Sequence, residues 1–136
     1  MRRMIAAATW MVTMAAALGT GTAAIGADEP KVTPLMLRDL VGTPGKEATM
    51  ITVEYPPGWS SSPHRHDAQT FVYVLEGSVV MAVQGGKEVT LGPGETFYES
   101  PDDVHSVSRN ASATKPAKFL VFMVKDKDKP TSTPVK

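Results

Sequence analysis

The chain has 136 residues, of which 42% are hydrophobic, so it has room for one domain with a modest core. Its 14 Lys and Arg residues balance 14 Asp and Glu residues, so the overall charge does not attract nucleic acid and favours a small neutral or weakly charged ligand. The chain has no cysteine, which excludes disulfides, thiolate zinc sites and thiol nucleophiles and leaves His, carboxylate, amide or hydroxyl groups for any metal site.

Residues 1–27 have the composition of a secretory signal peptide. Two arginines precede an apolar stretch, residues 4–18, and small residues ending at Ala27 supply a cleavage site. Gly and Thr at 19–22 interrupt the stretch before it reaches the roughly 20 residues that span a bilayer. We therefore expect a periplasmic or secreted protein with no stable membrane insertion after cleavage, exported by either the Sec or the twin-arginine route.

The remaining chain predicts short strands separated by turns. Residues 28–48 are expected to form an extended leader with one short strand or turn, and 125–136, with alternating charge and two prolines, a disordered tail. No segment between them shows sustained helical periodicity, so we predict an all-β, antiparallel sandwich or barrel. The expected strands are 50–55, 70–77, two within 78–92 that are joined at Gly85 and Gly86, 96–99, 105–109 and 117–124.

The three histidines of the chain are candidate metal ligands. His64 and His66 are two residues apart, so on a strand their side chains point the same way and both imidazoles can reach one ion. His105 opens a later predicted strand, from which it can supply a third nitrogen. Three imidazoles leave positions open for water, dioxygen or substrate, whereas the alternative is that these are ordinary solvated polar residues.

The sequence around the first two histidines resembles the first motif of the cupin superfamily. That motif runs glycine, five residues, H-x-H, three or four residues, glutamate, six residues, glycine. Here Gly58 precedes His64 by five residues, and FVYVLEG ends at Gly77.

The second cupin motif has a counterpart around His105. Its spacing from Gly94 to His105 is kept, Asn110 stands one residue late, and Ser100 and Asp102 replace the turn proline and glycine. The resemblance covers residues 49–124 and implies a small antiparallel β-barrel of the cupin type, also called a double-stranded β-helix or jelly roll. It also implies a homodimer that pairs through edge strands.

One ligand of the first motif is missing. The glutamate position is occupied by Thr70, a poor ligand, and Gln69 reaches the ion only if a bulge turns its amide inward. The sequence leaves open three His plus Gln69, or three His alone. Without a carboxylate we expect weaker binding of hard cations such as Mn²⁺ and favour Fe²⁺, Ni²⁺, Cu²⁺ or Zn²⁺. Tyr98 and Glu99 can serve as acid or base near the metal, but exposed strand positions are the expectation for both.

The resemblance supports two classes of function. The first is a metal-dependent dioxygenase acting on a small enolic or aromatic compound, with an isomerase or lyase as a weaker variant. The second is a non-catalytic extracytoplasmic protein that binds a metal or a small ligand. In both, the partner is a small molecule and the cofactor one divalent transition metal.

Overall fold

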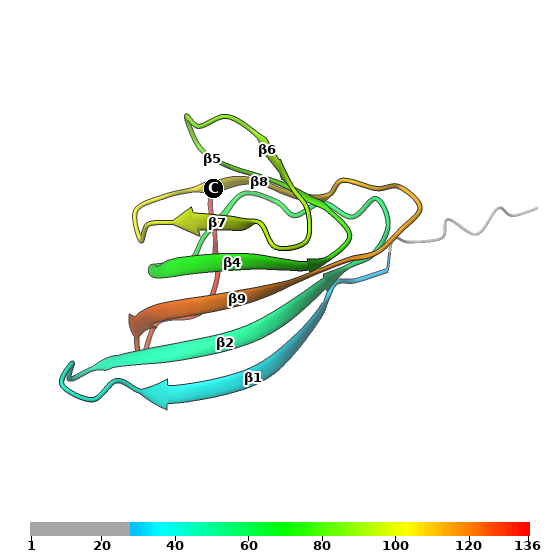
Figure 1. The fold of residues 1–136 in the computed structure, drawn as a ribbon. Coiled ribbons are helices and arrows are strands. Elements are labelled where there is room, and N and C mark those ends of the chain that lie inside the picture. The colour runs from blue at the N-terminus through cyan, green and yellow to red at the C-terminus, as the bar shows by residue number, and fades with distance from the viewer. Residues whose placement is uncertain (1–27) are drawn as a thin grey trace, which may run out of the picture.

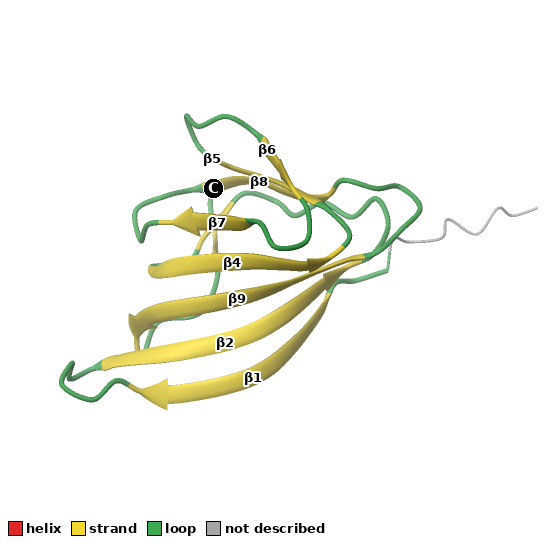
Figure 2. Cartoon of the chain, viewed as in Figure 1, coloured by secondary structure: helices red, strands yellow, loops and turns green. Residues whose placement is uncertain are grey.

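The structure is a computed structural model that describes residues 28–136, so the predicted signal peptide lies outside the described residues (Figure 1). The described part contains strands and loops without a helix, and hence no helix able to cross a membrane (Figure 2). The strands are β1 (Lys31–Asp39), β2 (Lys46–Tyr55), β3 (His64–Arg65), β4 (Ala68–Glu76), β5 (Val79–Val83), β6 (Val89–Leu91), β7 (Thr96–Glu99), β8 (His105–Asn110), β9 (Ala117–Asp126) and β10 (Thr133–Pro134).

The strands form two five-stranded sheets. One has the order β1-β2-β9-β4-β7 and the other β10-β3-β8-β5-β6, and every pairing is antiparallel. Figure 1 shows the first sheet running from β1 to β7, with β5, β6 and β8 of the second sheet beyond it. The prediction of an all-β antiparallel fold is confirmed.

The core lies between the sheets and follows from the alternation along the strands. In β4 the residues Ala68, Thr70, Val72 and Val74 are buried while their neighbours are exposed, as expected where side chains alternate faces. The same alternation in β9 buries side chains from Ala117 to Met123. These inward faces join Val79 and Met81 of β5 in one hydrophobic cluster.

The N-terminal leader is more regular than expected. Instead of a short strand or turn within 28–48, β1 spans nine residues and pairs with β2, whose first residue is Lys46. Nearly every side chain of β1 is exposed, so its sequence has no alternation to detect. The backbone ladder with β2 holds it in place.

The C-terminal segment also differs from the expected disordered tail. Strand β9 continues to Asp126, Lys125 is buried, and β10 pairs with β3 in the opposite sheet. In Figure 1 the red segment crosses from the end of β9 to that sheet. Backbone pairing and one buried charge order these residues, and neither is visible in their composition.

Candidate metal centre

Strand pairing brings the three histidines together. His64 on β3 lies opposite His105, the first residue of β8, and His66 follows β3 directly. One ring nitrogen from each of the three lies within 4.8 Å of the others. The expected convergence of His64, His66 and His105 is therefore present in the structure.

Backbone carbonyls fix the orientation of two of these rings. His64 donates from Nδ1 to the carbonyl oxygen of Ser62 at 2.9 Å, and His66 donates from Nδ1 to that of Thr131 at 2.6 Å. Because a carbonyl only accepts, each Nδ1 carries a hydrogen, and a ring in its neutral form then has its lone pair at Nε2. The two Nε2 atoms are 3.2 Å apart, an arrangement that a shared proton or a cation between them stabilises.

His105 is the most buried of the three, with 3% of its surface exposed. Neither of its ring nitrogens has a hydrogen-bond partner among the described residues. Burial, reinforced by His64 and His66, lowers the pKa of His105 to about 3, and burial also lowers the pKa of His66. Both rings are neutral at neutral pH, the form that binds metals.

A carboxylate that we expected to be exposed completes the cluster. Glu99, at the end of β7, is only 2% exposed. Its Oε1 lies 3.1 Å from Nδ1 of His105 and its Oε2 lies 3.7 Å from Nε2 of His66. Burial, with Asp103 adding to it, raises the pKa of Glu99 to about 8, so the contact with neutral His105 is not an ion pair at neutral pH.

Strand register explains the position of Glu99. It pairs directly with Thr70 of β4, and residues paired across antiparallel strands point to the same face. Thr70 is fully buried and occupies the place of the motif's glutamate. The site therefore has a carboxylate, which comes from β7 and not from the neighbouring strand β4.

Gln69 is not brought to the histidines. It lies on the exposed face of β4, so the alternative with an inward bulge at this position does not describe the structure. Tyr98 is exposed as expected, whereas the expectation that Glu99 is exposed was wrong. Phe97 is the residue that could have indicated the burial of Glu99, because the two share a strand face and Phe97 packs against the core.

The cluster borders a small inner cavity of about 70 Å³. Apolar side chains from both sheets form most of its wall, and hydroxyl groups supply the remaining polar atoms. Tyr55 and Ser108 form a buried hydrogen bond of 2.7 Å there, and burial raises the pKa of Tyr55 to about 12. The other lining residues are Ile51, Val53, Thr70, Val72, Met81, Phe119, Val121 and Met123.

An outer pocket of about 260 Å³ adjoins this cavity, because both are lined by His64 and His66. Trp59, Thr131 and Ser132 form part of its wall. It gives a ligand a path to the histidines.

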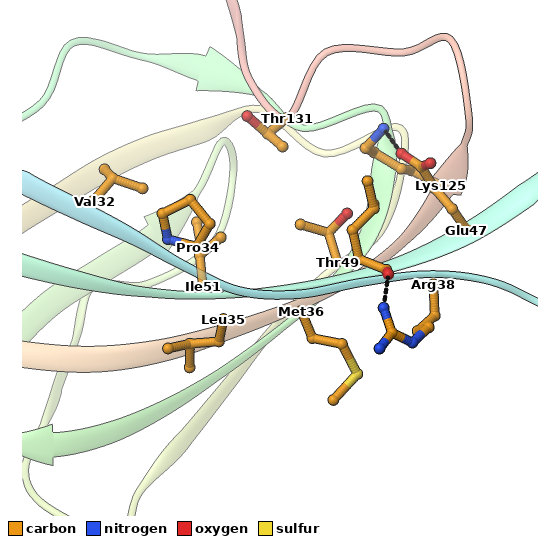
Figure 3. Close-up of a pocket in the computed structure, with 11 residues that line it drawn as sticks. Val32, Pro34, Leu35, Met36, Arg38, Glu47, Thr49, Ile51, Lys125 and Thr131 are labelled. Atoms are coloured by element: carbon orange, nitrogen blue, oxygen red, sulfur yellow. Dashed lines mark hydrogen bonds and ion pairs between the residues drawn. The ribbon is translucent and has the colours of Figure 1, made fainter.

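A larger groove of about 600 Å³ runs along β1 (Figure 3). Val32, Pro34 and Ile51 line its apolar part, and the ion pair between Glu47 and Lys125 lies at one end. The groove does not include the histidines.

Several solved structures of other proteins have a similar fold. The DMSP lyase DddQ from Ruegeria pomeroyi DSS-3 is 20% identical, with a TM-score of 0.57 over 65% of this chain and 43% of that chain. An oxalate oxidase in complex with the substrate analogue glycolate is 24% identical, with a TM-score of 0.58 over 78% of this chain and 55% of that one. The protein TT1209 from Thermus thermophilus is 26% identical, with a TM-score of 0.57 over 71% and 84%.

The chain spans about half the length of the first two structures, and at their identity the likeness shows the fold alone. No curated protein sequence matches. The family comparison assigns residues 51–123, more than half of the chain, to the cupin domain, and these residues contain the three histidines and Glu99. The protein therefore belongs to the cupin family.

Proposed function

We propose that the protein binds one divalent transition metal ion through His64, His66 and His105, with Glu99 as the fourth ligand. The observation that carries this proposal is the convergence of two lone-pair nitrogens at 3.2 Å beside buried polar atoms without partners in the described chain. Three imidazoles and one carboxylate suit Fe²⁺, Ni²⁺, Cu²⁺ and Zn²⁺. The expectation of weak Mn²⁺ binding assumed a site without a carboxylate. Because Glu99 supplies one, that reason no longer applies.

We further propose that this site acts on a small molecule, in the first instance as a dioxygenase on an enolic or aromatic compound. A bound ion would supply Lewis-acid chemistry and a place for dioxygen. The inner cavity accepts only the reacting end of a ligand, and the outer pocket holds its body. Two of the structural neighbours, an oxalate oxidase and a DMSP lyase, are enzymes, which supports catalysis without naming the reaction.

The protein's own residues would prepare that chemistry. Val72, Met81 and Phe119 exclude water from the inner cavity. Tyr55 keeps its proton at neutral pH, because its pKa is about 12, and its pair with Ser108 can bind a polar group of the ligand. Glu99 can hold a proton beside the histidines.

The second candidate is a non-catalytic extracytoplasmic protein that captures a metal or a small ligand. The small inner cavity favours it, because about 70 Å³ beside a four-ligand site leaves little room for a substrate. Export is proposed from the composition of residues 1–27, and a homodimer from the family and from the exposed edge strand β1.

The test begins with the metal content of untagged protein, residues 28–136, beside a His64→Ala/His105→Ala variant. We expect about one ion per chain in the parent and almost none in the variant. Oxygen uptake is then measured with β-diketones, flavonols and oxalate. A loaded protein that turns over none of these supports the binding protein, and a parent that stays free of metal after reconstitution contradicts the dioxygenase and the metal-binding form of the second candidate.

A further inference from the structure

We propose that the C-terminal segment, residues 127–136, positions His66 for ion binding, so that docking of this segment and occupation of the site are coupled. The inference rests on the metal binding proposed above and goes beyond it. It assigns a role to residues whose composition is that of a disordered tail.

The first support is an anchor at the start of the segment. Lys125, with 5% of its surface exposed, forms an ion pair with buried Glu47. The same ammonium group donates to the carbonyl oxygen of Lys129 at 2.7 Å. Lys127 adds a backbone hydrogen bond to the carbonyl of Gly45 at 3.0 Å, so the turn after β9 is tied to the first sheet.

The second support is an anchor at the end of the segment, on the second sheet. Thr133 and Pro134 of β10 pair with Arg65 and His64. The backbone N–H of Val135 donates to the carbonyl of Pro63 at 3.4 Å. The second anchor therefore holds the same short stretch that carries two of the three histidines.

Between the anchors, the segment contacts the site itself. The carbonyl oxygen of Thr131 accepts the Nδ1 hydrogen of His66 at 2.6 Å, and Figure 3 shows Thr131 near the Glu47–Lys125 pair. His64 obtains its carbonyl partner from Ser62, two residues away, whereas the partner of His66 is 65 residues away. Only His66 thus depends on a distant segment for its tautomer and ring orientation.

The backbone around His66 makes that dependence larger. His66 lies outside β3 and β4, and the next residue, Asp67, has φ of 46°. No strand ladder fixes this position, so the Thr131 carbonyl provides the directional contact that orients the ring. Thr131 and Ser132 also line the outer pocket, and the segment therefore forms one wall of the approach to the histidines.

The experiment compares Zn²⁺ affinity in the full chain with that of two truncations. One ends at Pro130 and removes the Thr131 carbonyl and β10. The matched control ends at Val135 and keeps both, together with the Val135 hydrogen bond to Pro63. We expect the first to bind Zn²⁺ about 10- to 100-fold more weakly and the control to stay near the full chain. Equal affinities in all three would overturn the proposal.

A second readout of the Pro130 truncation does not depend on metal binding. In metal-free full chain, ¹⁵N NMR of the imidazoles should show His66 protonated at Nδ1, and the Pro130 truncation should shift it toward a mixture of tautomers. A merely structural role of the segment predicts no such change. If the full chain bound no Zn²⁺ but the tautomer still changed, the metal proposal would fail while the positioning role stood.

The intact protein offers a third measurement if the truncation does not fold. Because coupling is reciprocal, saturating Zn²⁺ should slow amide hydrogen exchange in residues 131–135 of the full chain. The β5–β6 turn, residues 84–88, serves as the internal control and should not change. Zn²⁺ binding without any protection of 131–135 contradicts the coupling.

Discussion

At the scale of single residues, the carboxylate of the site comes from Glu99 and not from position 70, where the cupin motif has its glutamate. Thr70 is where the family pattern has its glutamate, and its paired neighbour Glu99 carries the carboxylate into the same cavity. The H-x-H pair and His105 could be found from spacing because each ligand is fixed by its own position in the motif. Glu99 could not, because which residue it faces depends on the register between β4 and β7, and register is a property of the folded sheet.

Replacing Glu99 by Gln should change protein stability and metal affinity in opposite directions. The pKa of Glu99 is about 8 in the folded protein and 4.5 when unperturbed. The unfolded chain therefore loses this proton first, and the stability of metal-free protein falls as pH rises from about 4.5 to 8. At pH 9 we expect Glu99→Gln to be more stable by about 1–3 kcal/mol and to bind metal more weakly. At pH 4 the two proteins should differ little.

Thermal unfolding of metal-free protein at the two pH values measures the effect. The control is Glu76→Gln, which changes an exposed carboxylate at the end of β4. A Glu99→Gln protein that is less stable than the parent at pH 9 would show that the buried carboxylate is satisfied without a metal.

Exchanging the paired residues tests the register argument. Thr70→Glu/Glu99→Thr conserves the summed side-chain volume and returns the carboxylate to β4, facing the same cavity. We expect its metal affinity to lie within about tenfold of the parent, whereas Glu99→Thr alone loses more. Isothermal titration with Zn²⁺ provides the measurement, with Gln69→Ala as a control that leaves affinity unchanged. If the double variant binds no better than Glu99→Thr alone, position 70 does not face the ion.

At the scale of elements, the strands that could be predicted from the sequence are those with one buried face. Strands β4 and β9 alternate between buried and less buried residues, and their sequences predicted them. Strand β1 has no such alternation and β10 has two residues, so β1 depends on backbone pairing with the next strand, β2, and β10 on pairing with the distant β3. Phe71 and Tyr73 show that residue type alone does not predict which face of a strand is buried. Both are aromatic, as is common in strands, and both are exposed.

The turn after β4 carries a glycine with two separate constraints. Gly77 has φ of 69°, and a Cβ there would meet the Pro116 carbonyl oxygen at 2.5 Å. Gly85 has φ of 82° and an open surrounding. We expect Gly77→Ala to lower the free energy of unfolding by about 3 kcal/mol and Gly85→Ala by about 1 kcal/mol.

Urea unfolding of both variants checks this difference. Since both glycines share the left-handed conformation, the excess cost at Gly77 measures the backbone contact alone. Equal losses would mean that the chain near Pro116 moves aside without cost.

At the scale of the whole molecule, β1 is the exposed edge of its sheet and carries the largest run of exposed apolar side chains among residues 28–136. Val32, Leu35, Met36 and Leu37 are each about half exposed. Such a strand invites pairing with a second copy. The proposed homodimer would cover this surface, in which Val32 also lines the outer pocket, whereas Leu35 and Leu37 line neither that pocket nor the inner cavity.

Charges on β1 should therefore separate the subunits without affecting the site. We expect Leu35→Lys/Leu37→Lys to be monomeric at micromolar concentrations where the parent is dimeric, with unchanged metal content. Light scattering after size exclusion gives the mass. Val41→Lys, at a fully exposed residue of the β1–β2 turn, is the control and should stay dimeric. A parent that is already monomeric rules out the dimer.

The pairing of Thr70 with Glu99 also constrains how one ligand arrangement can change into the other. Two single substitutions separate them, and the intermediate has either two carboxylates on paired positions or none. Two buried carboxylates side by side repel each other and bind a proton instead. Both intermediates keep the three histidines, but the one without a carboxylate avoids this repulsion in the metal-free protein, so we infer that the change passes through a three-nitrogen site.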